Sequence, residues 1–256
     1  MIGTFLFPKP ESQQFRLLVY MLRSVIFLPI FCLLNLCSHT ASNISMITKN
    51  DTLSMNEYSY LALGDSYTIA QSVPAAESYP AQTVHILSAE NIHFSDPEII
   101  ARTGWTTADL LNKISTDPPQ RSTYDIVTLL IGVNNQYQHL SEEQYKIAFD
   151  TLLNKAIQYA NNKKERVIVL SIPDYSVTPF AQGSDRAYIA AQIDLFNNIN
   201  KTISLQAGVN YLDITAYTRM AATDQSLVAY DGLHPSGKEY GVWAKDLAEK
   251  IKAILK

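Results

Sequence analysis

The chain has 256 residues, of which 47% are hydrophobic, and Asp and Glu outnumber Lys and Arg by 24 to 20. This length and apolar content suit a globular protein of one or at most two domains with a full hydrophobic core, and exclude a collagen-like or disordered chain. The net charge of −4 at pH 7 argues against a nucleic-acid partner.

Residues 1–41 are predicted to be an export leader. Arg16 and Arg23 precede the uncharged stretch SVIFLPIFCLLNL, which is short for a membrane span but typical of a secretory hydrophobic region, and small and polar residues follow it. Met21 offers a second start, which would shorten this leader. We therefore expect an exported protein that is periplasmic, secreted or anchored at the cell envelope. The alternative interpretation is a retained signal anchor.

Both cysteines, Cys32 and Cys37, lie within the leader. Cys37 ends the apolar run as in a bacterial lipoprotein signal, but Leu36 stands where that signal carries Gly, Ala or Ser, so simple cleavage is favoured over lipidation. Lipidation of Cys37 would give peripheral membrane association. A mature chain starting near residue 42 has no disulfide framework or thiolate metal site, and its net charge changes from −4 to −6.

The rest of the chain is predicted to be a linker at 42–55, which is polar and aperiodic, and one domain at 56–256. Apolar runs predict strands at 58–64, 97–101, 125–132, 166–173 and 209–214, and amphipathic patterns predict helices at 78–91, 106–115, 141–161, 185–207 and 236–254. This alternation predicts a three-layer α/β/α domain around a five-stranded, mainly parallel sheet. The continuous Val, Ile and Leu content of the third and fourth strands predicts burial on both faces.

Polar clusters follow the ends of the predicted strands. Ser66 comes just after the first strand, and the clusters RTGWT, IGVNNQY and SIPDYSVTPF follow the second, third and fourth, while YDGLHPSG precedes the last helix. Ligands of open parallel sheets bind beyond the carboxyl ends of the strands, so we expect all five clusters on one rim. This shared position indicates a site more strongly than any single motif does.

Ser66 is a candidate nucleophile, but a serine hydroxyl needs a base on the same rim to remove its proton. Among five histidines, His234 lies on a turn-rich loop with Asp231 three residues earlier, so the carboxylate can reach Nδ1 and leave Nε2 free for Ser66. Asp174 is a competing partner for the imidazole, and the spacing favours Asp231. Asp65 is better suited to fixing its turn than to acting as an acid. Alternatively, these residues only cap helices and turns.

Acyl transfer also requires hydrogen-bond donors for the oxyanion of its intermediate. The backbone N–H groups of Ser66 and Gly104 and the side-chain amide of Asn134 are the candidates. Taken singly, Gly104 and Asn134 are more often turn residues, but together with Ser66 and His234 they supply every role that acyl transfer requires. Rim aromatic residues are candidates for a substrate pocket or, alternatively, for the core: Trp105, Tyr137, Tyr175 and Phe180.

Four blocks resemble, in order, those of the SGNH (GDSL-type) hydrolase superfamily, from about residue 58 to the C-terminus. GDSYT gives Ser66, RTGWTT gives Gly104, LLIGVNNQY gives Asn134, and DGLHPSG gives Asp231 and His234. The chain is similar, more narrowly, to small bacterial secreted or lipid-anchored members. The resemblance implies a flavodoxin-like α/β/α fold and ester hydrolysis through an acyl-enzyme.

The third block departs from the common G-x-N-D pattern because Asn135 replaces the Asp. The oxyanion role attaches to Asn134 and is unaffected, whereas the hydrogen bonds made by the second residue, and with them the substrate preference, are open.

The leading hypothesis is therefore an exported serine esterase or lipase that cleaves carboxylic esters of small molecules or lipids. The alternative is a catalytically silent cell-surface binding module on the same fold, which the complete set of residues disfavours. A nucleotide- or flavin-binding protein would need a glycine-rich loop that GDSYTIA lacks, no metal-hydrolase motif is present, and nothing indicates a cofactor. Short acyl esters, lysophospholipids, thioesters and acetylated sugars all need the same rim residues.

Overall fold

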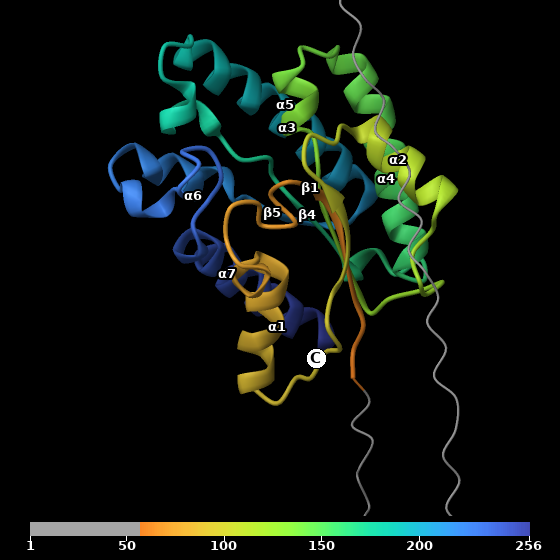
Figure 1. Ribbon diagram of the computed structural model, residues 1–256. Coiled ribbons are helices and arrows are strands. Elements are labelled where there is room, and N and C mark those ends of the chain that lie inside the picture. The colour runs from red at the N-terminus through yellow and green to blue at the C-terminus, as the bar shows by residue number, and fades with distance from the viewer. Residues whose placement is uncertain (1–56) are drawn as a thin grey trace, which may run out of the picture. The chain divides into compact units, whose positions relative to one another are not determined.

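The computed structural model describes residues 57–256, so the predicted leader at 1–41 and linker at 42–55 lie outside the described residues. A five-stranded sheet in the order β2-β1-β3-β4-β5 forms the centre, and every pair of neighbours is parallel (Figure 1). The strands are β1 (Tyr60–Asp65), β2 (Glu98–Arg102), β3 (Ile126–Leu130), β4 (Val167–Leu170) and β5 (Asn210–Leu212). All five predicted strands are present.

Helices cover both faces of the sheet (Figure 1). One face carries α1 (Tyr79–Ala89) packed against α7 (Gly237–Leu255), with the short α6 (Thr215–Arg219) beside α7. The other carries α2 (Thr107–Thr116), α4 (Glu142–Tyr159) and α5 (Arg186–Ala207), with α3 (Val133–Tyr137) against α5. Short 3₁₀ helices lie at 75–77, 164–166, 175–177, 179–181, 220–222 and 225–227. The predicted three-layer α/β/α fold is confirmed.

The strands that position the site are buried. Every residue of β1, β3 and β4 is buried, as the apolar runs predict, while β2 at the sheet edge is partly exposed. β4 is shorter than predicted because the Ile172 N–H donates to the Asn197 side chain and Pro173 has no N–H. β5 also ends early, since the Ile214 N–H donates to the Ser171 hydroxyl instead of continuing the ladder.

The segment after β3 is a helix rather than the expected loop. α3 begins after Gly132, whose φ of +134° is a conformation that side chains rarely adopt, and a Cβ there would lie 2.7 Å from the Tyr145 ring. Glycine is therefore required at this turn for two independent reasons. The five-residue helix projects Asn134 from the end of β3 toward the carboxyl rim of the sheet.

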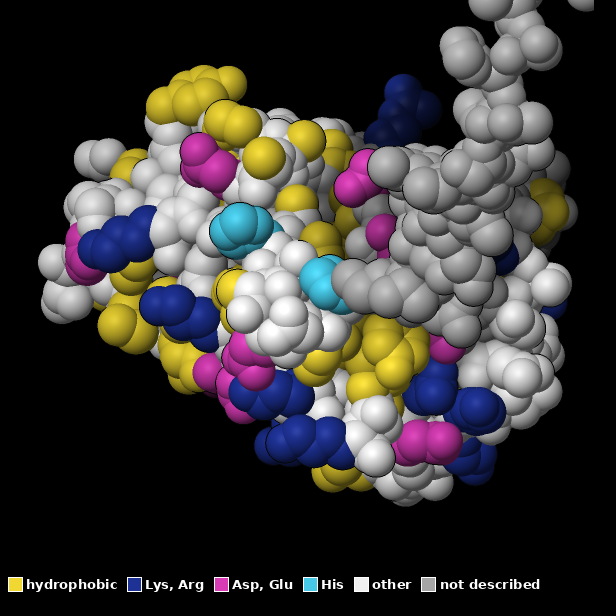
Figure 2. Space-filling view, turned by 90° about the horizontal axis from the view of Figure 1, so that it is seen from below, with side chains coloured by type: hydrophobic (Ala, Val, Ile, Leu, Met, Phe, Trp, Pro, Cys, Tyr) yellow, Lys and Arg dark blue, Asp and Glu magenta, His cyan; other side chains and the backbone are white. Residues whose placement is uncertain are grey.

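A serine side chain caps the start of α4. The Ser141 hydroxyl accepts a hydrogen bond from the Gln144 N–H, which satisfies one of the free donors in the first turn of the helix. On the face shown in Figure 2, acidic and basic side chains are interspersed with hydrophobic ones. No helix within residues 57–256 is long and apolar enough to span a membrane.

Candidate active site

Ser66 lies at a sharp exit from the central strand β1. The N–H groups of Thr68 and Ile69 both donate to the Asp65 carbonyl, which turns the chain immediately after the strand. A Cβ on Gly64 would lie 2.0 Å from the Thr68 hydroxyl oxygen and 2.6 Å from the Leu130 carbonyl, so only glycine fits before this turn.

Asp65 is buried directly before Ser66. Its carboxylate accepts the Tyr67 N–H at 3.0 Å, which fixes the turn as the sequence predicts. Burial raises the pKa of the Asp65 carboxyl to about 7, although the backbone hydrogen bond from Tyr67 acts in the opposite direction. Its contact with the backbone makes Asp65 part of the turn that presents Ser66.

Three of the predicted residues form a continuous hydrogen-bonded chain. His234 Nε2 lies 2.9 Å from Ser66 Oγ, and His234 Nδ1 lies 2.6 Å from Asp231 Oδ2. The other carboxylate oxygen, Oδ1, accepts the N–H groups of Leu233 and His234 at 2.9 and 3.0 Å. Gly232, with a φ of +72°, allows the tight turn between carboxylate and imidazole.

Ser72, which the motifs do not include, donates a further hydrogen bond to Asp231 Oδ2 at 2.6 Å. Burial alone would raise the pKa of the Asp231 carboxyl, but hydrogen bonds from Ser72, His234 and the Leu233 N–H lower it to about 2. The carboxyl is therefore ionised at neutral pH and can hold one tautomer of the imidazole. The Tyr67 ring packs against that imidazole with centroids 4.9 Å apart.

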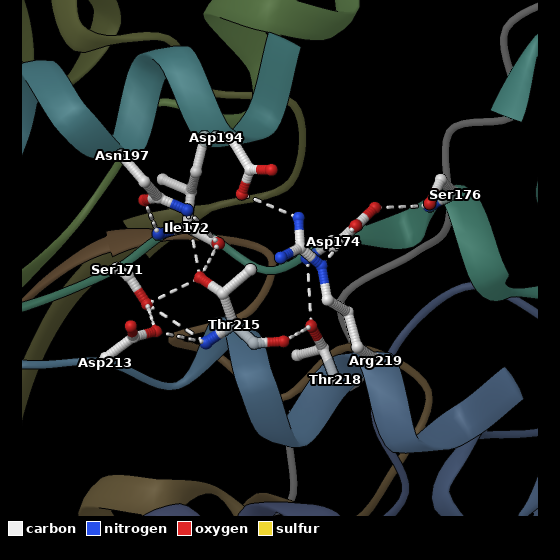
Figure 3. Close-up of polar contacts among 10 residues, drawn as sticks. All are labelled: Ser171, Ile172, Asp174, Ser176, Asp194, Asn197, Asp213, Thr215, Thr218 and Arg219. Atoms are coloured by element: carbon white, nitrogen blue, oxygen red, sulfur yellow. Dashed lines mark hydrogen bonds and ion pairs between the residues drawn. The ribbon is translucent and has the colours of Figure 1, made fainter. Parts of the chain in front are cut away.

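The Asp174 carboxylate bonds other groups than the His234 imidazole. Its carboxylate accepts the Ser176 N–H at 2.8 Å and pairs with the Arg219 guanidinium at 2.8 Å, as Figure 3 shows. Arg219 also reaches Asp194 on α5. Of the two carboxylates that the sequence offers to His234, only Asp231 contacts it.

The polar network in Figure 3 instead holds the loop that follows β4. Asn197 on α5 bonds both the N–H and the carbonyl of Ile172, and its amide also donates to the Thr215 hydroxyl. The Thr218 hydroxyl accepts the Asp174 N–H at 2.9 Å. Helices α5 and α6 thereby fix the loop whose next residue, Tyr175, faces the site.

The predicted oxyanion donors lie beside Ser66. Gly104 has a φ of +79° with open space where a Cβ would be, so its backbone conformation, not crowding, favours glycine. The Asn134 amide donates to the Trp105 carbonyl at 2.9 Å and leaves its second N–H available. Ser66, Gly104 and Asn134 all line one cavity together with His234.

Asn135 makes the hydrogen bonds that the sequence leaves open. It is buried, its Oδ1 accepts the Thr107 N–H at 3.0 Å, and its amide donates to the Thr107 hydroxyl at 2.8 Å. The residue thus ties α3 to the first turn of α2. An amide supplies the acceptor that an Asp would supply at this position.

The cavity has a volume of about 180 Å³ and an aromatic wall. Tyr137, Tyr175 and Phe180 form this aromatic wall, with ring centroids 6.0 to 6.1 Å apart. Trp105 is not among the lining residues; its side chain packs against the core instead. The lining also includes residues that were not predicted to belong to the site: Tyr67, Thr103, Val133 and Leu233 from the four blocks, and Gln71 outside them. None of the described lining residues is Asp, Glu, Lys or Arg.

A sequence model of the GDSL-like Lipase/Acylhydrolase family matches residues 62–242. The chain belongs to this family. The family match makes the protein a carboxylic ester hydrolase and confirms the resemblance seen in the four blocks. No curated protein sequence is significantly similar to the chain.

Solved structures of three bacterial enzymes share the fold of this family member. The lipase/acylhydrolase from Enterococcus faecalis is 19% identical, with a TM-score of 0.58 over 77% of this chain and 96% of that one. The esterase EstA from Pseudoalteromonas sp. is 19% identical, with a TM-score of 0.58 over 78% and 99%. The acetylxylan esterase Axe2 from Geobacillus stearothermophilus is 18% identical, with a TM-score of 0.58 over 76% and 94%. At these identities the likeness establishes the fold alone.

Proposed function

We propose that the protein is a serine esterase in which Ser66 is the nucleophile, His234 the general base and Asp231 the group that orients the imidazole. One observation carries the proposal: the unbroken hydrogen-bonded chain from Ser66 Oγ through His234 to Asp231, with distances of 2.9 and 2.6 Å. This is the geometry in which a histidine removes a serine proton while a carboxylate holds the other ring nitrogen.

The reaction proceeds in two similar halves. His234 Nε2 takes the proton of Ser66 as Oγ forms a bond to the ester carbonyl carbon, and the carbonyl oxygen becomes the oxyanion. The intermediate then collapses, the ester C–O bond breaks, and His234 returns the proton to the departing alcohol. Water next adds to the acyl-enzyme with His234 again as base, which releases the carboxylic acid and restores Ser66.

The oxyanion is stabilised by three proposed donors: the N–H groups of Ser66 and Gly104 and the free amide N–H of Asn134. Their common position on the cavity that holds His234 supports this role. Because Ser66 and His234 are buried, fixed donors beside them act on the developing charge more strongly than water would.

The lining of the cavity favours an uncharged substrate. None of the described lining residues carries a carboxylate, ammonium or guanidinium group, so the lining offers no permanently charged side chain to pair with a phosphate or carboxylate on the substrate. The volume of about 180 Å³ is similar to that of an apolar protein cavity that binds benzene, about 150 Å³. We expect the aromatic wall of Tyr137, Tyr175 and Phe180 to contact an acyl group of about four to six carbons, by that comparison.

The test is hydrolysis of p-nitrophenyl acetate, butyrate, hexanoate, octanoate and palmitate by the full chain, with Ser66→Ala as control. Activity that peaks at butyrate or hexanoate and disappears in the variant supports the proposal. Labelling of Ser66 by a fluorophosphonate tests the nucleophile independently of substrate choice. A folded protein that hydrolyses no ester and takes up no label would support the binding-module alternative.

The proposal includes export. The order of basic residues, apolar stretch and small polar residues within 1–41 supports a secretory leader. Fusing residues 1–41 to a reporter enzyme that is active only outside the cytoplasm tests it, and an inactive fusion would contradict it. Membrane association that disappears in a Cys37→Ala variant would indicate lipidation rather than simple cleavage.

A further inference from the structure

The Asp231 carboxylate accepts four hydrogen bonds, and three of them come from its own turn. The Leu233 and His234 N–H groups bond Oδ1, and the His234 ring bonds Oδ2. These three local donors hold the carboxylate relative to the imidazole, and they relate it to Ser66 only through the bond between His234 Nε2 and Ser66 Oγ. The fourth donor, the Ser72 hydroxyl at 2.6 Å from Oδ2, lies 159 residues away in the sequence.

Ser72 belongs to the loop that begins with the nucleophile. The Gln71 N–H donates to the Ser66 carbonyl at 3.0 Å, so the loop closes on itself one residue before Ser72. The Gln71 side chain in turn accepts a hydrogen bond from Thr103 of the glycine loop. The position of Ser72 is therefore tied to that of Ser66 through a short, bonded stretch of backbone.

The backbone of this loop is strained where Ser72 lies. Ser72 has a φ of +72° and Ala70 a φ of +56°, both in the left-handed region that residues with a Cβ disfavour. Such conformations persist where surrounding contacts impose them, and they cluster at functional sites. Glycine would adopt the same backbone conformation without strain, yet the position carries a serine whose hydroxyl reaches Asp231.

We propose that Ser72 is a positioning residue that links the loop of the nucleophile to the carboxylate that orients the histidine. The hydroxyl contacts the same oxygen as the imidazole, so it sets the direction from which Asp231 meets Nδ1 and keeps that oxygen near Ser66. The proposal rests on the catalytic roles assigned above to Ser66, His234 and Asp231. The low pKa of the Asp231 carboxyl, to which this hydrogen bond contributes, is consistent with it.

The test compares Ser72→Gly with Ala70→Gly in the full chain. Both substitutions place glycine at a left-handed position of one loop, but only the first removes a donor to Asp231. For Ser72→Gly we expect kcat for p-nitrophenyl butyrate to fall by about 10- to 100-fold with KM unchanged, which corresponds to losing one hydrogen bond to a charged group. The free energy of unfolding should change little, because relief of the strained φ opposes the loss of the hydrogen bond and the greater freedom of the unfolded chain.

A spectroscopic readout separates positioning from a merely structural role. The ¹H NMR resonance of the His234 Nδ1 proton should shift in Ser72→Gly and stay in place in Ala70→Gly, because only the first variant alters the oxygen that this proton faces. An unshifted resonance in Ser72→Gly, wild-type kcat in that variant, or an equal loss of kcat in Ala70→Gly would each overturn the proposal. If the wild-type chain has no Ser66-dependent hydrolysis, the proposed function fails, while the resonance comparison still tests the link.

Discussion

Asn134 and Asn135 are neighbours in α3, and we expect their replacement by Ala to impair the protein in different ways. Asn134 lines the cavity beside Ser66, whereas Asn135 is buried and its side chain bonds the N–H and hydroxyl of Thr107. The two substitutions delete the same atoms from adjacent positions of one helix. They therefore form a matched pair in which one tests the proposed chemistry and the other tests the scaffold.

Asn134→Ala removes one proposed oxyanion donor. Loss of such a donor lowers kcat by about 10² to 10³, or about 3 to 4 kcal/mol in transition-state stabilisation. The variant also loses the hydrogen bond to the Trp105 carbonyl, which is only partly buried and can bond water instead. The free energy of unfolding should therefore fall by about 1 kcal/mol or less.

Asn135→Ala leaves two groups of buried Thr107 without their partner, the N–H at 3.0 Å and the hydroxyl at 2.8 Å. Each buried polar group left unpaired costs about 1 to 3 kcal/mol, so the free energy of unfolding should fall by roughly 2 to 6 kcal/mol. Under conditions where the variant is folded, kcat should stay within about tenfold of wild type, because no proposed donor to the oxyanion is lost.

Urea unfolding and steady-state hydrolysis of p-nitrophenyl butyrate on both variants check these values. The reasoning is refuted if Asn134→Ala retains wild-type kcat, since its amide is then no principal oxyanion donor. It is equally refuted if folded Asn135→Ala loses kcat by more than 100-fold while its stability is unchanged. That result would make Asn135, rather than Asn134, the residue that acts in catalysis.

Three other predictions concern residues around the site. Burial raises the pKa of Glu239 to about 7, so the free energy of unfolding should fall as pH rises from about 4.5 through 7. Glu239→Gln should reduce the slope of this pH dependence by up to about 1.4 kcal/mol per pH unit. An unchanged slope, measured by urea unfolding at several pH values, would contradict the prediction. Arg219→Met removes the cation that pairs with buried Asp174 and should lower the free energy of unfolding by about 3 kcal/mol. Asp194→Asn removes the exposed partner of the same guanidinium and should lower it by under about 1 kcal/mol. Equal losses of stability in the two variants would contradict this difference. Phe180→Ala removes part of the aromatic wall and should reduce kcat/KM for the hexanoate ester about tenfold more than for the acetate, and parallel losses would remove Phe180 from the acyl pocket.

The elements of the fold were predictable because their signals are local. The buried strands β3 and β4 carry apolar runs that only Thr128 interrupts, and α4 starts after Ser141, which caps it through a contact with Gln144 three residues away. The short α3 was not predictable, since VNNQY reads as a polar turn and the helix depends on Gly132 and on the Tyr145 ring that packs over it. Strand ends were misjudged where side chains from other segments take the backbone hydrogen bonds.

The candidate site divides in the same way. Ser66, Asp231 and His234 were predicted because spacing and strand position constrain them, and the structure brings them into hydrogen-bond contact. The direction of Trp105 was not predictable, because it depends on how the chain turns after Gly104 at a φ of +79°.

Contacts between residues that are distant in the sequence explain why the spacing of the motifs predicts only some of the residues in this site. Ser72 meets Asp231 and Asn135 meets Thr107, and in each case a short polar side chain joins two segments that are distant in the sequence. Such bonds depend on direction, so they fix the relative positions of rim loops more tightly than apolar packing between those loops would. The relative positions of the site residues therefore depend on the hydrogen bonds between the blocks as well as on the residues within each block. It follows that loss of the Ser72 link should lower kcat without altering any group that contacts the substrate, whereas loss of the Asn135 link should act mainly on stability.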